Sequence, residues 1–159
     1  MTRKEQYNQL ILQIAGLIKD ETNLVGILAN VSAALHDTFP ERFFWVGFYL
    51  QENGNMLRLG PFQGSVACYV IPFGKGVCGK AWEEGRTLIV PDVEKFPGHI
   101  ACSSLSRSEI VVPMYDDSHT FRGVLDIDST QLNDFNEDDK EGLERIIELL
   151  MAETHDLFQ

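Results

Sequence analysis

The sequence predicts an α+β fold in which about six strands form an antiparallel sheet. Apolar residues recur every three to four positions near both ends of the chain, as they do on one face of an amphipathic helix. Between these ends they alternate or cluster in short runs bounded by Gly, Pro and Asn and joined mainly by hairpin turns. We therefore expect N- and C-terminal helices on one face of the sheet, and a helix and loop forming a lid over a pocket on the other. The length of 159 residues leads us to expect a single domain over residues 1–159.

Residues 1–40 are expected to form two helices. The first spans residues 5–18, because its apolar residues recur at spacings of three and four. Thr22 or Asn23 can cap a second helix at residues 24–39, which ends at Pro40 because proline cannot continue a helix. The apolar face of this second helix is expected to consist of Val25, Leu28, Val31, Ala34 and Leu35.

Residues 41–130 are expected to hold the sheet. Residues 43–50 are aromatic and β-branched, and their alternation places Trp45, Gly47 and Tyr49 on one face of a strand. The opposite face is expected to carry Phe44, Val46, Phe48 and Leu50. Further strands are expected at residues 56–62, 66–71, 87–90, 110–115 and 121–128, with Cys68 in the strand at 66–71.

Two more helices interrupt and close this sheet. A short helix at residues 80–84 places Cys78 near its N-terminus, where the helix dipole lowers the pKa of a thiol. Asn136 can cap a final amphipathic helix, and we expect the C-terminal helix at residues 136–157. Its first turn contains three acids that the helix dipole favours, Glu137, Asp138 and Asp139.

The other elements are arranged around an expected active-site loop at residues 91–109. This stretch has no steady period of two or 3.6 residues, which favours irregular structure. Cys102 lies near its centre, His99 precedes it, and Glu109 lies at its far end. Functional residues favour irregular segments held between rigid elements, and long loops inside compact domains are often functional. The alternative is a surface loop that carries an inert, buried cysteine.

The chain has three cysteines, and their context bounds their chemistry. An odd count argues against a structural disulfide framework. No CxxC pair or standard zinc-ligand spacing is present, so we expect no metal site, although a zinc site formed by the three cysteines and His99 is conceivable. Two interpretations of Cys68, Cys78 and Cys102 stay open: buried small hydrophobic residues, or a redox relay.

Acidic and aromatic residues of two predicted strands suggest a ligand. Asp126 and Asp128 alternate with apolar residues and therefore share one strand face. Two neighbouring carboxylates repel each other unless a cation lies beside them. With Glu109 they would face an aromatic wall of Trp45 and Tyr49, an arrangement that holds small ammonium groups. The alternatives are a solvated sheet face for the acids and ordinary core positions for the aromatic residues.

Bulk properties exclude several classes of partner. The net charge of −11 disfavours binding to nucleic acid or to anionic membranes, which requires basic patches. No apolar run approaches the length of a membrane span, and the N-terminus lacks the apolar segment of a secretory signal. We therefore expect a cytoplasmic protein. A homodimer is compatible with the sequence.

Several of these segments together resemble a known family. They are W-V-G-F-Y (45–49), G-P-F-Q-G (60–64), V-A-C (66–68), I-P-F-G-K-G-V-C-G (71–79), V-P-D-V-E-K-F-P-G-H-I-A-C (90–102), S-E-I-V-V-P (108–113) and G-V-L-D-I-D-S (123–129). The set is similar to the free methionine-(R)-sulfoxide reductases, which are stand-alone GAF-domain enzymes. The resemblance covers more than half of the chain and includes all three cysteine contexts.

The resemblance implies the reduction of free methionine-(R)-sulfoxide to methionine. It implies Cys102 as the nucleophile, which attacks the sulfoxide sulfur and is left as a sulfenic acid. Cys68 is then the preferred resolving thiol and Cys78 the second choice, although Cys78 at a helix N-terminus could also be the nucleophile. Thioredoxin would reduce the resulting disulfide, and no metal or organic cofactor would be needed.

The resemblance also implies a substrate site. Glu109, Asp126 and Asp128 would be the substrate acids, one binding the α-ammonium and another donating the proton that sulfoxide reduction requires. Trp45 and Tyr49 would enclose the S-methyl group. Backbone N–H groups around residues 100–104 could receive the substrate carboxylate.

Two other functions compete with this interpretation. A non-catalytic GAF sensor or binding domain predicts a ligand pocket but gives no reason for three thiols. A peroxiredoxin-like thiol peroxidase would use Cys102 but gives no reason for carboxylates beside the thiol.

Overall fold

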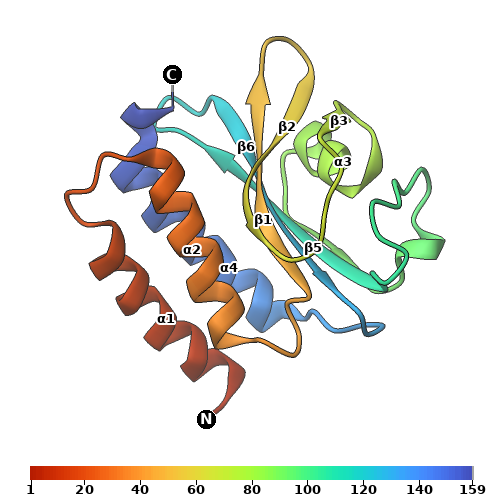
Figure 1. Cartoon of the computed structure of the whole chain (residues 1–159), viewed down its shortest axis with the longest axis horizontal. Coiled ribbons are helices and arrows are strands. Elements are labelled where there is room, and N and C mark those ends of the chain that lie inside the picture. Colours follow the sequence, from red (N-terminus) through yellow and green to blue (C-terminus); the bar gives the residue numbers. More distant parts are fainter. Residues whose placement is uncertain (159) are drawn as a thin grey trace.

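The computed structural model describes residues 1–158 and confirms the α+β fold. Within these residues, three long helices flank a six-stranded sheet (Figure 1). The helices are α1 (Arg3–Ile18), α2 (Leu24–Thr38), α3 (Gly76–Glu84) and α4 (Glu137–Thr154), with short 3₁₀ helices η1 (Val93–Lys95) and η2 (His155–Leu157). The strands are β1 (Trp45–Glu52), β2 (Met56–Gln63), β3 (Val70–Pro72), β4 (Leu88–Val90), β5 (Ser108–Tyr115) and β6 (Phe121–Ser129).

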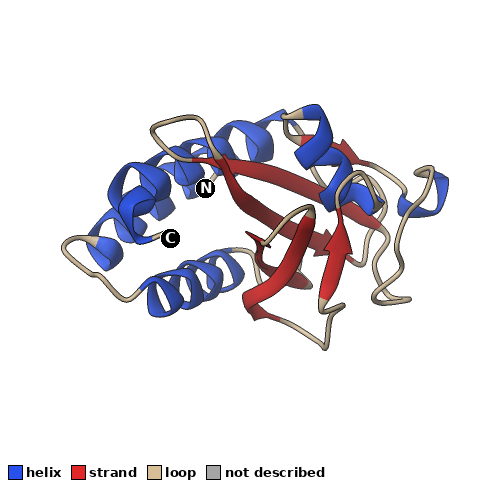
Figure 2. Cartoon of the chain, turned by 90° about the horizontal axis from the view of Figure 1, so that it is seen from above, coloured by secondary structure: helices blue, strands red, loops and turns tan. Residues whose placement is uncertain are grey.

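The strands lie in the order β3-β2-β1-β6-β5-β4, and every neighbouring pair is antiparallel. The hairpins β1–β2 and β5–β6 meet at the centre of the sheet, where β1 pairs with β6. The helices α1, α2 and α4 cover one face, while α3 lies against the other (Figures 1 and 2). None of the helices within residues 1–158 combines the length and apolarity that a membrane span requires.

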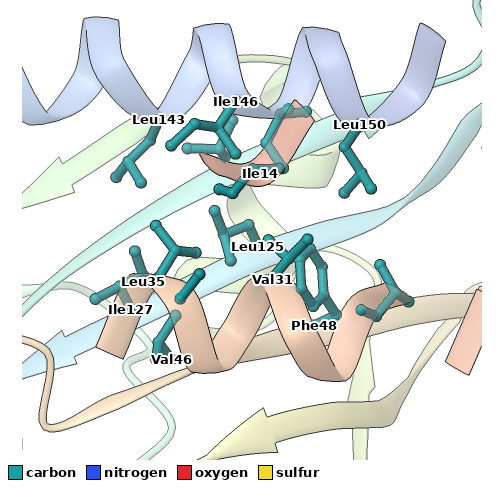
Figure 3. Close-up of a cluster of buried hydrophobic side chains, with 14 of the residues drawn as sticks. Ile14, Val31, Leu35, Val46, Phe48, Leu125, Ile127, Leu143, Ile146 and Leu150 are labelled. Carbon is teal, nitrogen blue, oxygen red and sulfur yellow. The ribbon is translucent and has the colours of Figure 1, made fainter. Parts of the chain in front are cut away.

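Alternate strand residues divide the apolar side chains between two clusters. Val46 and Phe48 of β1 pack into the helical side with Leu125 and Ile127 of β6 (Figure 3). Trp45 and Tyr49 instead join a second cluster with residues of α3 and β4 on the opposite face. The predicted division of β1 between two faces is therefore confirmed at these positions.

Asp139 at the start of α4 connects three parts of the helical side. Its side chain is fully buried and accepts from the Arg3 Nη1 at 2.8 Å, the Tyr7 hydroxyl at 2.6 Å and the Arg42 Nη2 at 3.0 Å. It also accepts from the backbone N–H of Asn136, which caps α4 as the sequence predicts. A buried carboxylate with this many donors, two of them cationic, remains compensated.

The third strand is shorter than predicted. β3 begins at Val70, so Cys68 lies in an irregular segment at residues 64–69 rather than in a strand. Gly64 turns the chain there with a φ of 138°. The carbonyl of Ser65 accepts a hydrogen bond from the Trp45 side chain, and that of Cys68 accepts one from the Tyr49 side chain. Two side-chain donors thus hold this segment, together with the backbone bond from the Leu59 N–H to the Tyr69 carbonyl.

Two of the predicted face assignments are wrong. Val25 is 68% exposed, because the buried face of α2 is formed by Ile27, Leu28, Val31 and Leu35 and does not include Val25. Phe44 packs with the cluster on the α3 side, because β1 begins only at Trp45 and the alternation does not extend before the strand.

The observed boundaries of the helices and of the predicted loop differ from the predicted ones by a few residues. α1 begins at Arg3, because Thr2 and Glu5 form a capping box, and Asn23 rather than Thr22 caps α2. α3 begins at Gly76 and is longer than predicted. The segment at residues 91–109 contains η1, and Glu109 lies within β5, where it pairs with Asp128. The last α-helix ends at Thr154, before the predicted end at residue 157, and the 3₁₀ helix η2 follows it.

Candidate active site

A pocket opens between the sheet, α3 and the segment that follows η1. Seven of the eight residues singled out from the sequence line it: Trp45, Tyr49, Cys78, Cys102, Glu109, Asp126 and Asp128. The eighth, Cys68, is bonded to Cys102 at the same place. The remaining lining residues are Phe44, Val66, Ala67, Ile71, Gly76, Val77, His99, Ile100, Ser103 and Ser106. The folded chain therefore gathers residues that are up to 84 positions apart, from Phe44 to Asp128, around one cavity.

Trp45 and Tyr49 form one wall of the pocket. Their rings stack with centroids 5.8 Å apart, and Phe62 stacks on the Trp45 ring at 5.0 Å. Gly47 lies between them in β1, where a Cβ would come within 2.2 Å of the Phe62 Cβ, so only glycine fits there. The two rings also carry the donors that hold residues 64–69, because the Trp45 Nε1 donates to the Ser65 carbonyl and the Tyr49 hydroxyl to the Cys68 carbonyl, each at 3.0 Å.

The three acids come together through strand register. Glu109 of β5 lies directly opposite Asp128 of β6, and Asp126 lies two residues further along β6, opposite Gly47 of β1. Side chains two residues apart point to the same sheet face, so all three carboxyl groups face the pocket. Glu109 and Asp126 are 6% and 5% exposed, and Asp128 is half-buried.

Burial and mutual repulsion keep protons on this cluster. Burial, followed by the negative charges of Asp126 and Asp128, holds the pKa of Glu109 well above its usual range. Burial and the charge of Asp126 do the same to the pKa of Asp128. Burial also raises the pKa of Asp126, but hydrogen bonds from Glu109 and Cys78 favour its ionised form and oppose that rise. The cluster as a whole therefore retains protons to higher pH than isolated carboxyl groups would.

No strong cation compensates these acids within the described chain. Neither lysine nor arginine occurs among the pocket residues of the part that the structure describes. The nearest basic group is His99, whose Nε2 lies 3.9 Å from the Glu109 Oε1, and burial lowers the pKa of that imidazole. The Asp126 Oδ1 is buried and has no hydrogen-bond partner within residues 1–158. A ligand that brings a cation into the pocket would satisfy this oxygen.

Two of the three thiols are joined at the pocket. A disulfide links Cys68 to Cys102 with a Cα–Cα separation of 5.5 Å, which is the pairing that the sequence resemblance implies. Both residues are partly exposed, so an external thiol can approach the bond. The disulfide connects the segment held by Trp45 and Tyr49 to the segment that follows η1.

The environment of Cys78 contradicts the predicted low pKa of its thiol. Cys78 does lie in the first turn of α3, but it is buried and free. Burial and the charge of Asp126 raise the pKa of this thiol well above its usual value and outweigh the helix dipole. Its sulfur and the carboxyl oxygens of Glu109 and Asp126 lie within 4.8 Å of one another, which makes these three residues the set that could hold a metal ion in the described chain.

Sequence reasoning missed part of the pocket wall. Phe44 was assigned to the other face, and Ile71, Val77 and Ser106 carried no signal in their local pattern. Val77 of α3 and Ser106 of the segment after η1 reach the cavity only because these elements pack over the sheet.

Comparison with known proteins agrees with this geometry. The GAF domain family matches residues 21–152. A free methionine-R-sulfoxide reductase of Saccharomyces cerevisiae is 43% identical to the chain, with 94% of this chain and 86% of the yeast protein aligned. A reductase of the same name from Escherichia coli is 42% identical, over 92% of this chain and 87% of that protein. The chain belongs to the free methionine-R-sulfoxide reductase family of GAF-domain proteins.

A solved member of this family has nearly the same fold. The free methionine-R-sulfoxide reductase of Neisseria meningitidis, determined in complex with its substrate, superimposes with a TM-score of 0.93 and is 46% identical. The match covers 98% of this chain and 92% of the Neisseria chain. The six-stranded sheet and its helical layer are thus common to this chain and to that enzyme of the family.

Proposed function

We propose that this chain reduces free L-methionine-(R)-S-oxide to L-methionine in the cytoplasm, using its own thiols and thioredoxin. One observation carries the proposal: in a member of this family, a disulfide between Cys68 and Cys102 borders a pocket whose buried acids lack a strong cation. The disulfide supplies a two-electron redox couple. The acids match the α-ammonium that distinguishes a free amino acid from a methionine residue in a peptide.

In the reduced enzyme, Cys102 attacks the sulfoxide sulfur as a thiolate. A bond forms between the two sulfurs. The protonated oxygen then passes to the Cys102 sulfur as the sulfur–oxygen bond of the substrate and the bond between the two sulfurs break, so methionine leaves with two more electrons and Cys102 is left as a sulfenic acid. The Cys68 thiol then attacks the sulfenic sulfur, and water leaves as the disulfide forms. Thioredoxin reduces this disulfide by thiol–disulfide exchange, so the net reaction consumes two electrons and two protons.

The acids divide the remaining tasks. Asp126, whose ionised form hydrogen bonds from Glu109 and Cys78 favour, pairs with the substrate ammonium through its otherwise unsatisfied Oδ1. Glu109 or Asp128, whose pKa burial and the neighbouring charge raise, donates a proton to the sulfoxide oxygen as the sulfur–oxygen bond breaks. No metal or organic cofactor takes part in these steps.

The rest of the pocket orients the substrate. The stacked rings of Trp45 and Tyr49 enclose the S-methyl group and exclude water from the reacting sulfur. Backbone N–H groups of residues 100–104 receive the substrate carboxylate. Together these contacts present one face of the sulfoxide to Cys102, which gives the preference for the R epimer.

The deciding experiment is an NADPH-coupled thioredoxin assay with the separated R and S epimers of free methionine sulfoxide. We expect NADPH oxidation with the R epimer and almost none with the S epimer. A non-catalytic sensor would instead bind one of these ligands without turnover, so the absence of NADPH oxidation with either epimer contradicts the proposal.

Variants of the cysteines test the assigned roles. Cys102→Ser is expected to lower kcat by roughly 10³-fold or more, because the nucleophile is lost. Cys68→Ser is expected to slow recycling by thioredoxin more than the release of the first methionine, which rapid-quench measurements separate.

After one equivalent of substrate without reductant, peptide mass spectrometry of Cys78→Ser should still show Cys68 linked to Cys102. Substantial steady-state turnover by Cys102→Ser would exclude it as the nucleophile.

A further inference from the structure

Three side chains of the pocket together form a possible metal site, although the proposed reduction uses no metal. The sulfur of Cys78 and carboxyl oxygens of Glu109 and Asp126 come from α3, β5 and β6 and lie within 4.8 Å of one another. All three side chains are buried, with exposed fractions of 3%, 6% and 5%. Around a tetrahedral zinc ion, sulfur and oxygen ligands lie about 3.4–3.6 Å apart, so an ion would need to draw the widest pair together by roughly 1 Å.

A second observation is that this cluster of acids lacks a compensating positive charge. The Asp126 Oδ1 is buried and has no hydrogen-bond partner in the described residues, although the side chain is 5% exposed and faces the pocket. Within residues 1–158, no lysine or arginine lines the pocket. A divalent cation would satisfy this oxygen and remove the repulsion between the neighbouring carboxylates.

The ligand set selects the class of metal. One thiolate and two carboxylates suit a borderline-soft ion such as Zn²⁺ or Co²⁺, whereas Mg²⁺ and Ca²⁺ prefer six or more oxygen ligands. Three protein ligands leave one position open toward the pocket. Water can occupy about 40 Å³ of that pocket, which is enough for a fourth ligand. The Cys78 thiol would lose its proton on binding, as metal ligation requires.

We propose that Cys78, Glu109 and Asp126 bind one Zn²⁺ ion, and that this ion inhibits the enzyme by occupying the acids that would otherwise hold the substrate. The metal site stands on the side-chain geometry alone. Its inhibitory role rests on the function proposed above, because it assumes that Asp126 pairs with the substrate ammonium and that Glu109 can donate a proton. The ion is therefore an inhibitor and not a cofactor.

The oxidised protein isolates the metal site from the other thiols. Of the three cysteines in the chain, Cys68 and Cys102 are joined, so Cys78 is the one thiol left to bind a metal. Titration of this protein with Co²⁺ should produce the near-ultraviolet absorption band of a cobalt–thiolate bond and saturate at one ion per chain. Zn²⁺ should displace the cobalt and abolish the band.

Two variants identify the ligands. Cys78→Ser should lose the cobalt–thiolate band, and Asp126→Asn should keep a band but bind Co²⁺ at least about tenfold more weakly. Circular dichroism of both variants checks that they are folded. Oxidised wild-type protein that shows no band with excess Co²⁺ overturns the metal site, and so does an affinity unchanged in Asp126→Asn.

A competition experiment tests the inhibition separately. Free methionine should weaken Co²⁺ binding by the oxidised wild-type protein, and Zn²⁺ should raise KM for the sulfoxide without lowering kcat at saturating substrate. If the protein reduces no methionine sulfoxide, the proposed function fails while the cobalt titration still decides the site. Zinc inhibition that is just as strong in Cys78→Ser overturns the inhibitory role, because it would then arise at Cys68 or Cys102.

Discussion

Two buried aspartates, Asp139 on the helical side of the sheet and Asp126 on the pocket side, have opposite surroundings. Asp139 is fully buried and contacts the Arg3 and Arg42 guanidinium groups and the Tyr7 hydroxyl. Asp126 is 5% exposed and is surrounded by Glu109, Asp128 and the Cys78 thiol, with one oxygen unsatisfied within residues 1–158.

This difference in partners distinguishes a carboxylate that stabilises the fold from carboxylates that need a bound ligand to supply a cation. Asp139 finds its cations inside the chain, so it joins α1, α4 and the segment before β1 in the absence of any other molecule. The pocket acids lack such partners, so they retain protons or repel one another until a cation arrives. Free methionine sulfoxide carries that cation as its α-ammonium. The same chemical change at the two aspartates should therefore have opposite effects.

The largest effect is expected when the cation is removed from the substrate. N-acetylation replaces the ammonium with a neutral amide and leaves the pocket acids unpaired. We expect kcat/KM for N-acetylated methionine-(R)-sulfoxide to be roughly two to four orders of magnitude below that for the free amino acid. Methionine-(R)-sulfoxide amide, which keeps the ammonium and lacks the carboxylate, is the matched control and should lose less. Equal reduction of free and peptide-bound methionine sulfoxide would show that the acids do not recognise the ammonium.

The next largest effect is expected on the helical side. Asp139→Asn leaves Arg42 and Arg3 without their shared carboxylate and weakens the cap of α4. We expect the free energy of unfolding to fall by about 3–5 kcal/mol, the usual result of removing one partner from a buried ion pair. Urea denaturation at neutral pH measures this change. A loss below about 1 kcal/mol would mean that the ion cluster contributes little to stability.

The smallest effect is expected in the pocket, and it has the opposite sign. Burial raises the pKa of both Glu109 and Asp128, and Asp126→Asn removes the charge that raises both pKa values further. We expect the unliganded variant to gain about 1–3 kcal/mol in unfolding free energy at pH 8, because a neutral amide costs less to bury beside Glu109 and Asp128 than a carboxylate does. It should lose catalytic efficiency at the same time. A variant that is both less stable and less active would contradict the proposed division between stability and function.

The pH dependence of this gain follows from the raised pKa values. The folded pocket binds more protons than the unfolded chain, so its contribution to stability is present in full below the unfolded-state pKa of about 4. That contribution is lost as the pH rises through the folded-state values. The advantage of Asp126→Asn over the wild type should therefore be small at pH 4 and grow toward pH 8. Because other groups titrate alike in both proteins, the difference between the two unfolding curves isolates the pocket.

The sequence predicts the pocket acids well because they depend on strand alternation. Asp126 and Asp128 alternate with Leu125 and Ile127, whose burial fixes the face on which the acids lie. Antiparallel pairing of β5 with β6 then brings Glu109 opposite Asp128. The helical caps Asn23 and Asn136 are predictable for a similar reason, since a cap depends on residues within one turn.

Features that depend on distant residues were not predictable in this way. The helix N-terminus at Cys78 suggested a low thiol pKa, but burial and the charge of Asp126, 48 residues away in the sequence, raise that pKa instead. For Asp139, the sequence predicts only a favourable interaction with the helix dipole. Its arginine and tyrosine partners lie far away in the sequence, in α1 and before β1. The segment that carries Cys68 is held by the side chains of Trp45 and Tyr49, which no local pattern in residues 64–69 reveals.

The most direct test of the central claim measures which ligands stabilise the unreacted pocket. Thermal unfolding of the wild type and of Asp126→Asn should be compared with methionine, 3-(methylthio)propylamine and N-acetylmethionine at equal concentrations. Methionine and the amine carry the ammonium, so both should raise the Tm of the wild type, and both should raise it less in Asp126→Asn. N-acetylmethionine should leave the Tm of both proteins nearly unchanged. Stabilisation of the wild type by N-acetylmethionine as strong as that by methionine would contradict the claim that the pocket acids await a cation.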